Sequence, residues 1–175
     1  MIDYIGSTTK CGYSYCNQAR VQANGREFEV QVLPTASLRF DANLTHLETK
    51  VLDAGFDTTG IGLFHKNEQL VRRPTTSWNA GAGFNDTRGS IDLRLVHVGE
   101  RPDRDFRPYP AKPVVVDAFT RTDVSGVLPL AQFARRLDGT ELTLRVENLF
   151  DKEYQSVFNF LTPRRMVLVG ARMSF

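Results

Sequence analysis

The sequence of 175 residues is poor in the side chains from which metal sites and catalytic centres are usually built. It contains three histidines, His46, His65 and His97, whose spacing does not match that of metal ligands. No HExxH motif, nucleophile elbow or phosphate-binding loop occurs. These absences argue against an enzyme, and we expect the chain to hold neither a cofactor nor a metal ion.

Cysteine is also scarce, and the two residues of this type, Cys11 and Cys16, lie close together in CGYSYC. Their spacing suits neither a redox CxxC motif nor a zinc site, which would need a second pair of ligands. We favour a small disulfide within a loop, because such a bond forms where a segment faces an oxidising compartment. Free thiols are the alternative.

The chain has no excess of one charge and no long apolar run. Its net charge is +2, so no polybasic surface points to nucleic acid. No run approaches the roughly 18 apolar residues of a transmembrane helix. A search for long apolar runs does not detect the strands of a membrane barrel, because half of their residues face the lumen and are polar. The opening residues also lack the basic and apolar regions of a signal peptide.

Alternation of apolar and polar residues is the strongest positive signal, and it is clearest at the end of the chain. The apolar side there consists of Val167, Val169, Ala171, Met173 and Phe175. Side chains of a strand alternate between its two faces, so this segment predicts a strand with one apolar face. Turn residues and alternation together predict about eight extended segments. They cover residues 2–5, 21–33, 38–48, 77–84, 89–98, 114–124, 141–147 and 166–175.

The connections between these segments alternate in length. Those at 6–20, 49–76, 99–113 and 149–165 are long, those at 34–37 and 85–88 are short, and the one at 125–139 is intermediate and fits least well. Outer-membrane barrels have long external loops and short periplasmic turns. The pattern therefore predicts an antiparallel transmembrane β-barrel. Its lumen would be lined by Glu27, Glu29, Arg39, Asp41, Arg94, Arg145, Glu147 and Arg172.

A family resemblance rests on several motifs. NLFDKEY at 148–154, followed by TPRR and a terminal strand ending in Phe, closely resembles the closing segment of TonB-dependent outer-membrane receptors. NGREFEV at 24–30, LVRRP at 70–74 and VGERPDRDFRPYP at 98–110 resemble the motifs that precede the last hairpins, in a layout most like the cobalamin-receptor branch. Two departures are Arg164, where the family usually has Gly, and Arg26, where an apolar residue is usual.

The resemblance implies a fold and a set of partners. The family forms twenty-two-stranded barrels with a plug. Residues 1–175 would then be the C-terminal portion of such a barrel in the bacterial outer membrane, with the plug domain and signal peptide outside this sequence. The implied partners are outer-membrane lipid, the TonB complex acting through the plug, and a small-molecule metal chelate or cobalamin. Phe175 resembles the signal that the barrel-assembly machinery reads.

Candidate ligand-binding residues lie in the expected external loops. They are Arg72, Arg73, Arg104, Phe106, Arg107, Tyr109 and Phe158. Aromatic rings with a few charged groups suit an amphipathic ligand. The charges of residues 99–113 nearly balance, which favours a bulky neutral or weakly charged chelate over a highly anionic siderophore.

Two other classes of protein would use alternating strands. A complete eight-stranded barrel could act as a passive structural or adhesion protein, since eight strands form the smallest closed membrane barrel. A soluble β-sandwich that binds a partner is the second alternative. The sandwich would cover one face of each strand with another sheet.

Overall fold

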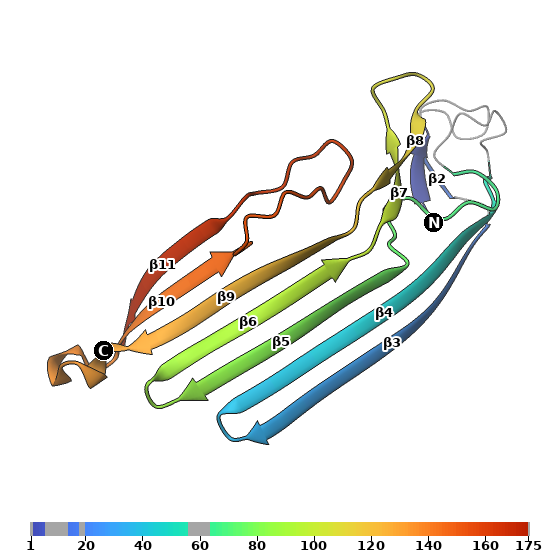
Figure 1. Cartoon of the computed structure of the whole chain (residues 1–175). Coiled ribbons are helices and arrows are strands. Elements are labelled where there is room, and N and C mark those ends of the chain that lie inside the picture. The colour runs from blue at the N-terminus through green and yellow to red at the C-terminus, as the bar shows by residue number, and fades with distance from the viewer. Residues whose placement is uncertain (1, 6–13, 18–19, 56–63, 175) are drawn as a thin grey trace.

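The computed structural model describes residues 2–5, 14–17, 20–55 and 64–174, and it consists almost entirely of antiparallel strands (Figure 1). The strands are β1 Ile2–Ile5, β2 Ser14–Asn17, β3 Arg20–Thr35, β4 Leu38–Asp53, β5 Thr76–Asp86, β6 Gly89–Val98, β7 Arg101–Asp105, β8 Lys112–Val116, β9 Phe119–Pro129, β10 Thr140–Glu147 and β11 Met166–Met173. Two 3-10 turns, η1 Leu130–Gln132 and η2 Arg135–Leu137, join β9 to β10. Within the described ranges, no helix is long and apolar enough to cross a membrane.

Seven strands form one open sheet in the order β11-β10-β9-β6-β5-β4-β3. Figure 1 shows them side by side as a single layer, with β3 and β11 at its two edges. The remaining strands form two small hairpins, β1 with β2 and β7 with β8. Residues 2–5 are therefore a strand, as predicted, but they do not pair with β11 to close a barrel.

The predicted strands are confirmed, with corrections at their ends, and two further strands, β2 and β7, lie in the connections predicted at 6–20 and 99–113. The segment 114–124 is two strands, because β8 pairs with β7 whereas β9 pairs with β6 and β10. The chain leaves the sheet at Gly99, where the N–H donates to the Thr76 carbonyl over 2.9 Å. A Cβ at Gly99 would lie 2.6 Å from that oxygen, so only glycine permits this exit. In addition, β4 and β9 run past their predicted ends at 48 and 124, to Asp53 and Pro129.

The two faces of the sheet differ in polarity, as the alternation predicts. Directly opposite residues on neighbouring strands share a face. The register places all the residues predicted to line the lumen on one face, namely Glu27, Glu29, Arg39, Asp41, Arg94, Arg145, Glu147 and Arg172. The other face carries large exposed apolar side chains, among them Phe28, Phe40, Ile91, Leu144 and Val169. No second sheet covers this face in the described parts of the chain, which argues against a β-sandwich.

Ion pairs on the polar face cross β5 from β4 to β6. Arg39 contacts Asp92 at 2.9 Å, and Arg94 contacts Asp41 at 3.0 Å. The β5 residues between these partners are Gly83 and Gly81. A Cβ at Gly81 would lie 2.8 Å from the Asp41 carboxylate, and one at Gly83 would lie 2.7 Å from that of Asp92. Glycine in β5 therefore leaves the space through which these pairs meet.

Connections of similar length gather at the same end of the sheet. The links at 99–118 and 148–165 and the described parts of the link between β4 and β5, residues 54–55 and 64–75, lie at one end, which we call the long-loop end. The turns at 36–37, 87–88 and 130–139 lie at the other, the short-turn end (Figure 1). This arrangement confirms the predicted sidedness. A buried apolar cluster of Val51, Phe64 and Leu70 lies at the long-loop end.

Candidate ligand-binding platform at the long-loop end

Asp103 in β7 ties three long connections together. Its carboxylate accepts hydrogen bonds from Arg72 Nε at 3.0 Å, from the Phe158 N–H at 2.9 Å and from its neighbour's N–H, that of Arg104, at 2.8 Å. These donors come from the connections 54–75, 99–118 and 148–165. Only 2% of Asp103 is exposed. A buried carboxylate with three donors is a strong structural link, because each bond involves a charged acceptor.

The charge of Asp103 is stabilised by these donors. Burial raises the pKa of a carboxyl group, but the backbone N–H groups of Phe158 and Arg104 and the Arg72 guanidinium lower it. The net result is a pKa of Asp103 below its ordinary value. Asp103 therefore carries its charge throughout the neutral range.

Arg101 provides a second buried link. Its guanidinium donates to the carbonyls of Gln155 and Ser156 in the 148–165 connection and to that of Gly99. It also lies over the Phe119 ring, 5.7 Å from the centroid. The hairpin β7–β8 is thus fastened to the 148–165 connection from both Arg101 and Asp103.

The NLFDKEY segment shapes the 148–165 connection. The buried Asn148 has φ 53°, a conformation that Asn tolerates better than most residues. Its side chain bonds both the N–H and the carbonyl of Lys152, closing a tight turn. Tyr154 then stacks on Phe119 with the ring centroids 4.1 Å apart. The motif therefore determines how the last long connection folds back over the sheet.

Arg164, the departure from the family pattern, closes the base of this connection. Its guanidinium donates to both carboxylate oxygens of Asp151, at 3.1 and 2.8 Å, and pairs with Glu153. The Arg165 N–H donates to the same Asp151 carboxylate. These bonds lower the pKa of Asp151 to about 2. The arginine is accommodated by the acids of the NLFDKEY segment.

Arg26, the other departure, lies opposite His46 on the apolar face of the sheet. Glu48 and Lys50 follow on that face of β4, toward the long-loop end. The charge of Arg26 therefore lies at the border of the apolar band rather than inside it.

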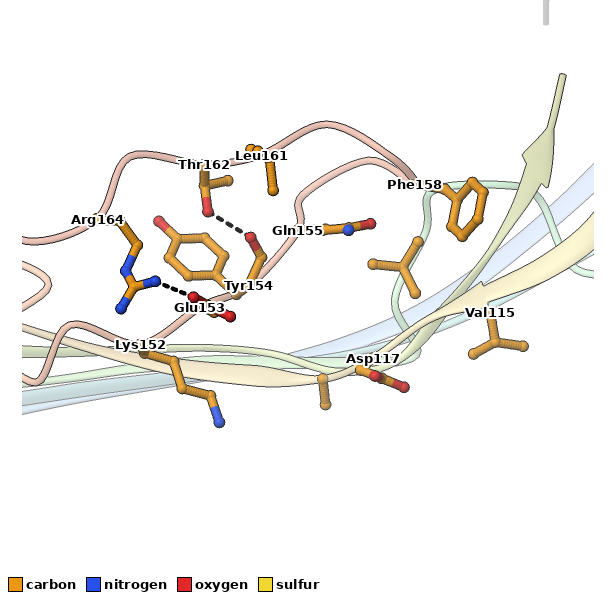
Figure 2. Close-up of a pocket in the computed structure, with 12 residues that line it drawn as sticks. Val115, Asp117, Lys152, Glu153, Tyr154, Gln155, Phe158, Leu161, Thr162 and Arg164 are labelled. Carbon is orange, nitrogen blue, oxygen red and sulfur yellow. Dashed lines mark hydrogen bonds and ion pairs between the residues drawn. The ribbon is translucent and has the colours of Figure 1, made fainter. Parts of the chain in front are cut away.

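A pocket of about 720 Å³ opens between the 148–165 connection and residues 115–118, which form the end of β8 and its link to β9 (Figure 2). Tyr154, Gln155, Phe158 and Leu161 line it from the connection, and Val115 and Asp117 line it from below (Figure 2). Figure 2 also shows Arg164 joined to Glu153 and the Thr162 hydroxyl donating to the Tyr154 carbonyl. A volume of this size and a mixed lining suit a small organic ligand.

The predicted ligand-binding arginines are mostly engaged in contacts within the protein. Arg72 bonds Asp103, and Arg104 is buried and pairs with Glu68 at 2.7 Å. Arg107 makes two bonds to Asp105, at 2.9 and 2.7 Å. Arg73 donates to the Arg72 carbonyl at 3.4 Å.

The predicted aromatic residues are partly brought together. Phe158 lines the pocket and lies under the Arg107 guanidinium, 5.6 Å from its centre. Phe106 and Tyr109 belong to the tip of the β7–β8 hairpin and are exposed, Tyr109 by 87%. Ligand binding by the seven predicted residues stays a prediction. Phe175, Cys11 and the disulfide from Cys11 to Cys16 lie outside the described residues.

We call the β7–β8 hairpin, together with residues 64–75 and 148–165 that pack around it, the platform. Asp103, Arg101 and Tyr154 hold the platform together, yet none is among the predicted site residues. Two of them lie in the RPDRD stretch of the VGERPDRDFRPYP motif, and Tyr154 ends the NLFDKEY motif. These two motifs were therefore the only sequence signal for the three residues. That Asp103 holds loops together could not be inferred from sequence, because its partners in the other connections are 31 and 55 residues away.

Comparison with known proteins gives one consistent result. No protein-family profile matches. The vitamin B12 transporter BtuB of Vibrio cholerae serotype O1 is 28% identical over 175 residues, which is the whole chain but 25% of that transporter. The siderophore receptor PiuA from Acinetobacter baumannii has a TM-score of 0.71 at 14% identity, over 92% of this chain and 23% of that one.

A further solved structure, the FrpB iron transporter from Neisseria meningitidis, has a TM-score of 0.70 at 17% identity, over 100% of this chain and 27% of that one. These matches confirm the resemblance to TonB-dependent outer-membrane receptors. The strands of this chain are arranged like those of an outer-membrane barrel, and the receptors that it resembles belong to the bacterial outer membrane. The chain spans about a quarter of the length of the relatives it matches. Members of this group are receptors and transporters rather than enzymes.

Proposed function

We propose that this chain is the C-terminal part of the barrel of a TonB-dependent receptor that imports a metal chelate or a cobalamin-like ligand. A plug domain and an export signal would lie upstream, and the TonB complex would act through the plug. The open sheet supports this proposal, because unpaired edges at β3 and β11 call for further strands.

The single observation that carries the ligand proposal is the rigid β7–β8 hairpin. Asp103 and Arg101 fix its base, while Phe106 and Tyr109 at its tip stay exposed. An exposed aromatic pair on a fixed support loses little entropy when it binds a ligand. We infer that these rings provide apolar contact area for the ligand at the barrel mouth.

The charges of the platform favour a neutral or weakly charged ligand. The guanidinium groups of Arg72, Arg104 and Arg107 each contact a carboxylate of the protein. Positive charge is therefore largely compensated, which weakens the attraction for a highly anionic siderophore. A corrinoid or a neutral ferric chelate fits this surface better.

The test replaces Phe106 and Tyr109 together with Ala in the full-length receptor. Removing two aromatic anchors should weaken ligand binding by about 1 to 3 kcal/mol, without lowering the amount of receptor in the membrane. Titrations with cobalamin and with ferric chelates measure the effect. Phe133→Ala is the matched control, because this exposed ring lies at the short-turn end. Unchanged affinity for every ligand that binds the wild type would contradict the proposal.

A further inference from the structure

The connection between β9 and β10 is unlike the other turns at the short-turn end. The turns at 36–37 and 87–88 have two residues each, whereas this one continues through η1 and η2 before β10 begins. It projects beyond the end of β9, near the C-terminus (Figure 1). Its length fitted the expected barrel pattern least well, and the receptor function does not account for it.

This connection is firmly attached to its neighbours. Gln132 Nε2 donates to the Arg88 carbonyl of the adjacent turn at 3.0 Å and to the Pro129 carbonyl at 2.8 Å. At its other end the Gly139 carbonyl accepts from the Ser174 N–H at 2.9 Å. Whatever the connection exposes is therefore held in a fixed position at the end of the barrel wall.

An aromatic ring and two cations are exposed on this fixed support. Phe133 is 68% exposed. Arg135 and Arg136 are exposed as well, and among the described residues neither guanidinium group has an ion-pair or hydrogen-bond partner. The nearby acids Asp86 and Asp138 each accept a backbone N–H of their own turn. The two guanidinium groups are thus available to a ligand outside the protein.

The apolar face of the sheet leads directly to this connection. Leu128 and Leu142 are opposite each other on that face at the short-turn end, and both are exposed. This face is the lipid-facing surface of the barrel. An aromatic ring that continues such a surface, with arginines beyond it, matches the composition of a membrane interface.

We propose that the β9–β10 connection is an interfacial anchor for the periplasmic leaflet of the outer membrane. Phe133 lies among the lipids at the border of the hydrocarbon region. Arg135 and Arg136 bind the phosphate groups of anionic phospholipids, because a guanidinium forms paired hydrogen bonds with phosphate. The partner is a phospholipid headgroup, and the proposal depends on the outer-membrane location but not on the imported ligand.

The test uses the full-length receptor in nanodiscs, with Cys11 and Cys16 replaced by Ser and a nitrobenzoxadiazole dye on Phe133→Cys. This dye is bright and blue-shifted in a bilayer and dim in water. We expect a bright, blue-shifted signal in discs that contain phosphatidylglycerol. The same dye on Ala36→Cys, in a short turn at the same end, should stay dim. Equal dim signals at both positions would overturn the anchor.

Charge variants test the headgroup contact. Replacing Arg135 and Arg136 with Gln should lower the population of the inserted state by about fivefold for each arginine in phosphatidylglycerol discs. Little change is expected in phosphatidylcholine discs. Lys66→Gln with Arg73→Gln removes the same charge at the long-loop end and should leave the dye signal unchanged. An unchanged signal after the Arg135 and Arg136 replacements, or an equal drop with the control pair, would overturn the phospholipid contact.

Discussion

At the scale of single residues, buried charge in this chain connects loops. Asp103 and Arg101 reach partners that are more than 30 residues away in sequence. Most of these partners are backbone groups, which have no side-chain identity to change. Such contacts fix the platform whatever side chains the loops present to a ligand.

Replacing Asp103 with Asn tests this role. The amide keeps the shape but removes the charge, leaves Arg72 without its carboxylate and weakens the bond from the Phe158 N–H. Loss of one partner of a buried hydrogen bond costs about 1 to 3 kcal/mol. Hydrogen exchange of the Phe158 amide should therefore accelerate by about 5- to 150-fold. The control is Asp117→Asn, because this exposed acid lines the same pocket as Phe158. Equal exchange rates in both variants would contradict the role of Asp103 as a link between loops.

The pair of Asp151 and Arg164 predicts a specific acid sensitivity. The pKa of Asp151 is lowered to about 2, below the ordinary value of about 3.9. A group with a lowered pKa stabilises the fold above its unfolded pKa, and this contribution is lost as pH falls toward 2. The loop 148–165 should keep its resistance to an acid protease at pH 4 and lose it progressively toward pH 2.

A direct titration of the Asp151 carboxyl by NMR provides the matching measurement. The midpoint should lie near 2 and should rise toward 3.9 in Arg164→Gln. A midpoint near 3.9 in the unmodified protein would show that the ion pair does not form.

At the scale of elements, the sheet depends on small residues in β5. Gly81→Ala would place a methyl group 2.8 Å from the Asp41 carboxylate and displace the Arg94 ion pair. Loss of a partly exposed ion pair of this kind costs about 0.2 to 1 kcal/mol. Unfolding in urea, followed by heat-modifiable migration of the full-length receptor, measures the loss. Gly25→Ala in β3 is the control, since its Cβ would lie 3.3 Å from the His46 carbonyl and would reach no ion pair across β5. Equal losses in the two variants would contradict the role of the β5 glycines.

The strands were predictable from sequence because their side chains alternate with period two, as in Ile91, Leu93 and Leu95 of β6. The break between β8 and β9 was not predictable, because Val114, Val115 and Val116 look like part of the strand that follows. The chain leaves the sheet at Gly99, and β8 therefore pairs with β7 before β9 pairs with β6. The loop platform was beyond sequence reasoning for a different reason. Its bonds join side chains to distant backbone groups, and residue patterns carry no record of such pairs.

At the scale of the whole molecule, the central claim is that one face of the open sheet meets lipid and the other meets the barrel interior. The apolar face is exposed over several strands, and burying it in water-free surroundings is strongly favourable, at about 25 cal/mol per Å². The polar face carries ion pairs, such as Arg39 with Asp92, whose charged groups require water or polar partners. A single layer with these two faces is stable only as part of a closed wall.

A spin-label scan along β6 in the full-length receptor tests this claim most directly. Labels at Ile91, Leu93 and Leu95 should be accessible to oxygen dissolved in the bilayer. Labels at Asp92 and Arg94 should instead be shielded from bilayer oxygen. Accessibility should therefore alternate with period two over these five positions. Equal accessibility at all five, or an alternation in the opposite phase, would contradict the assignment of the two faces.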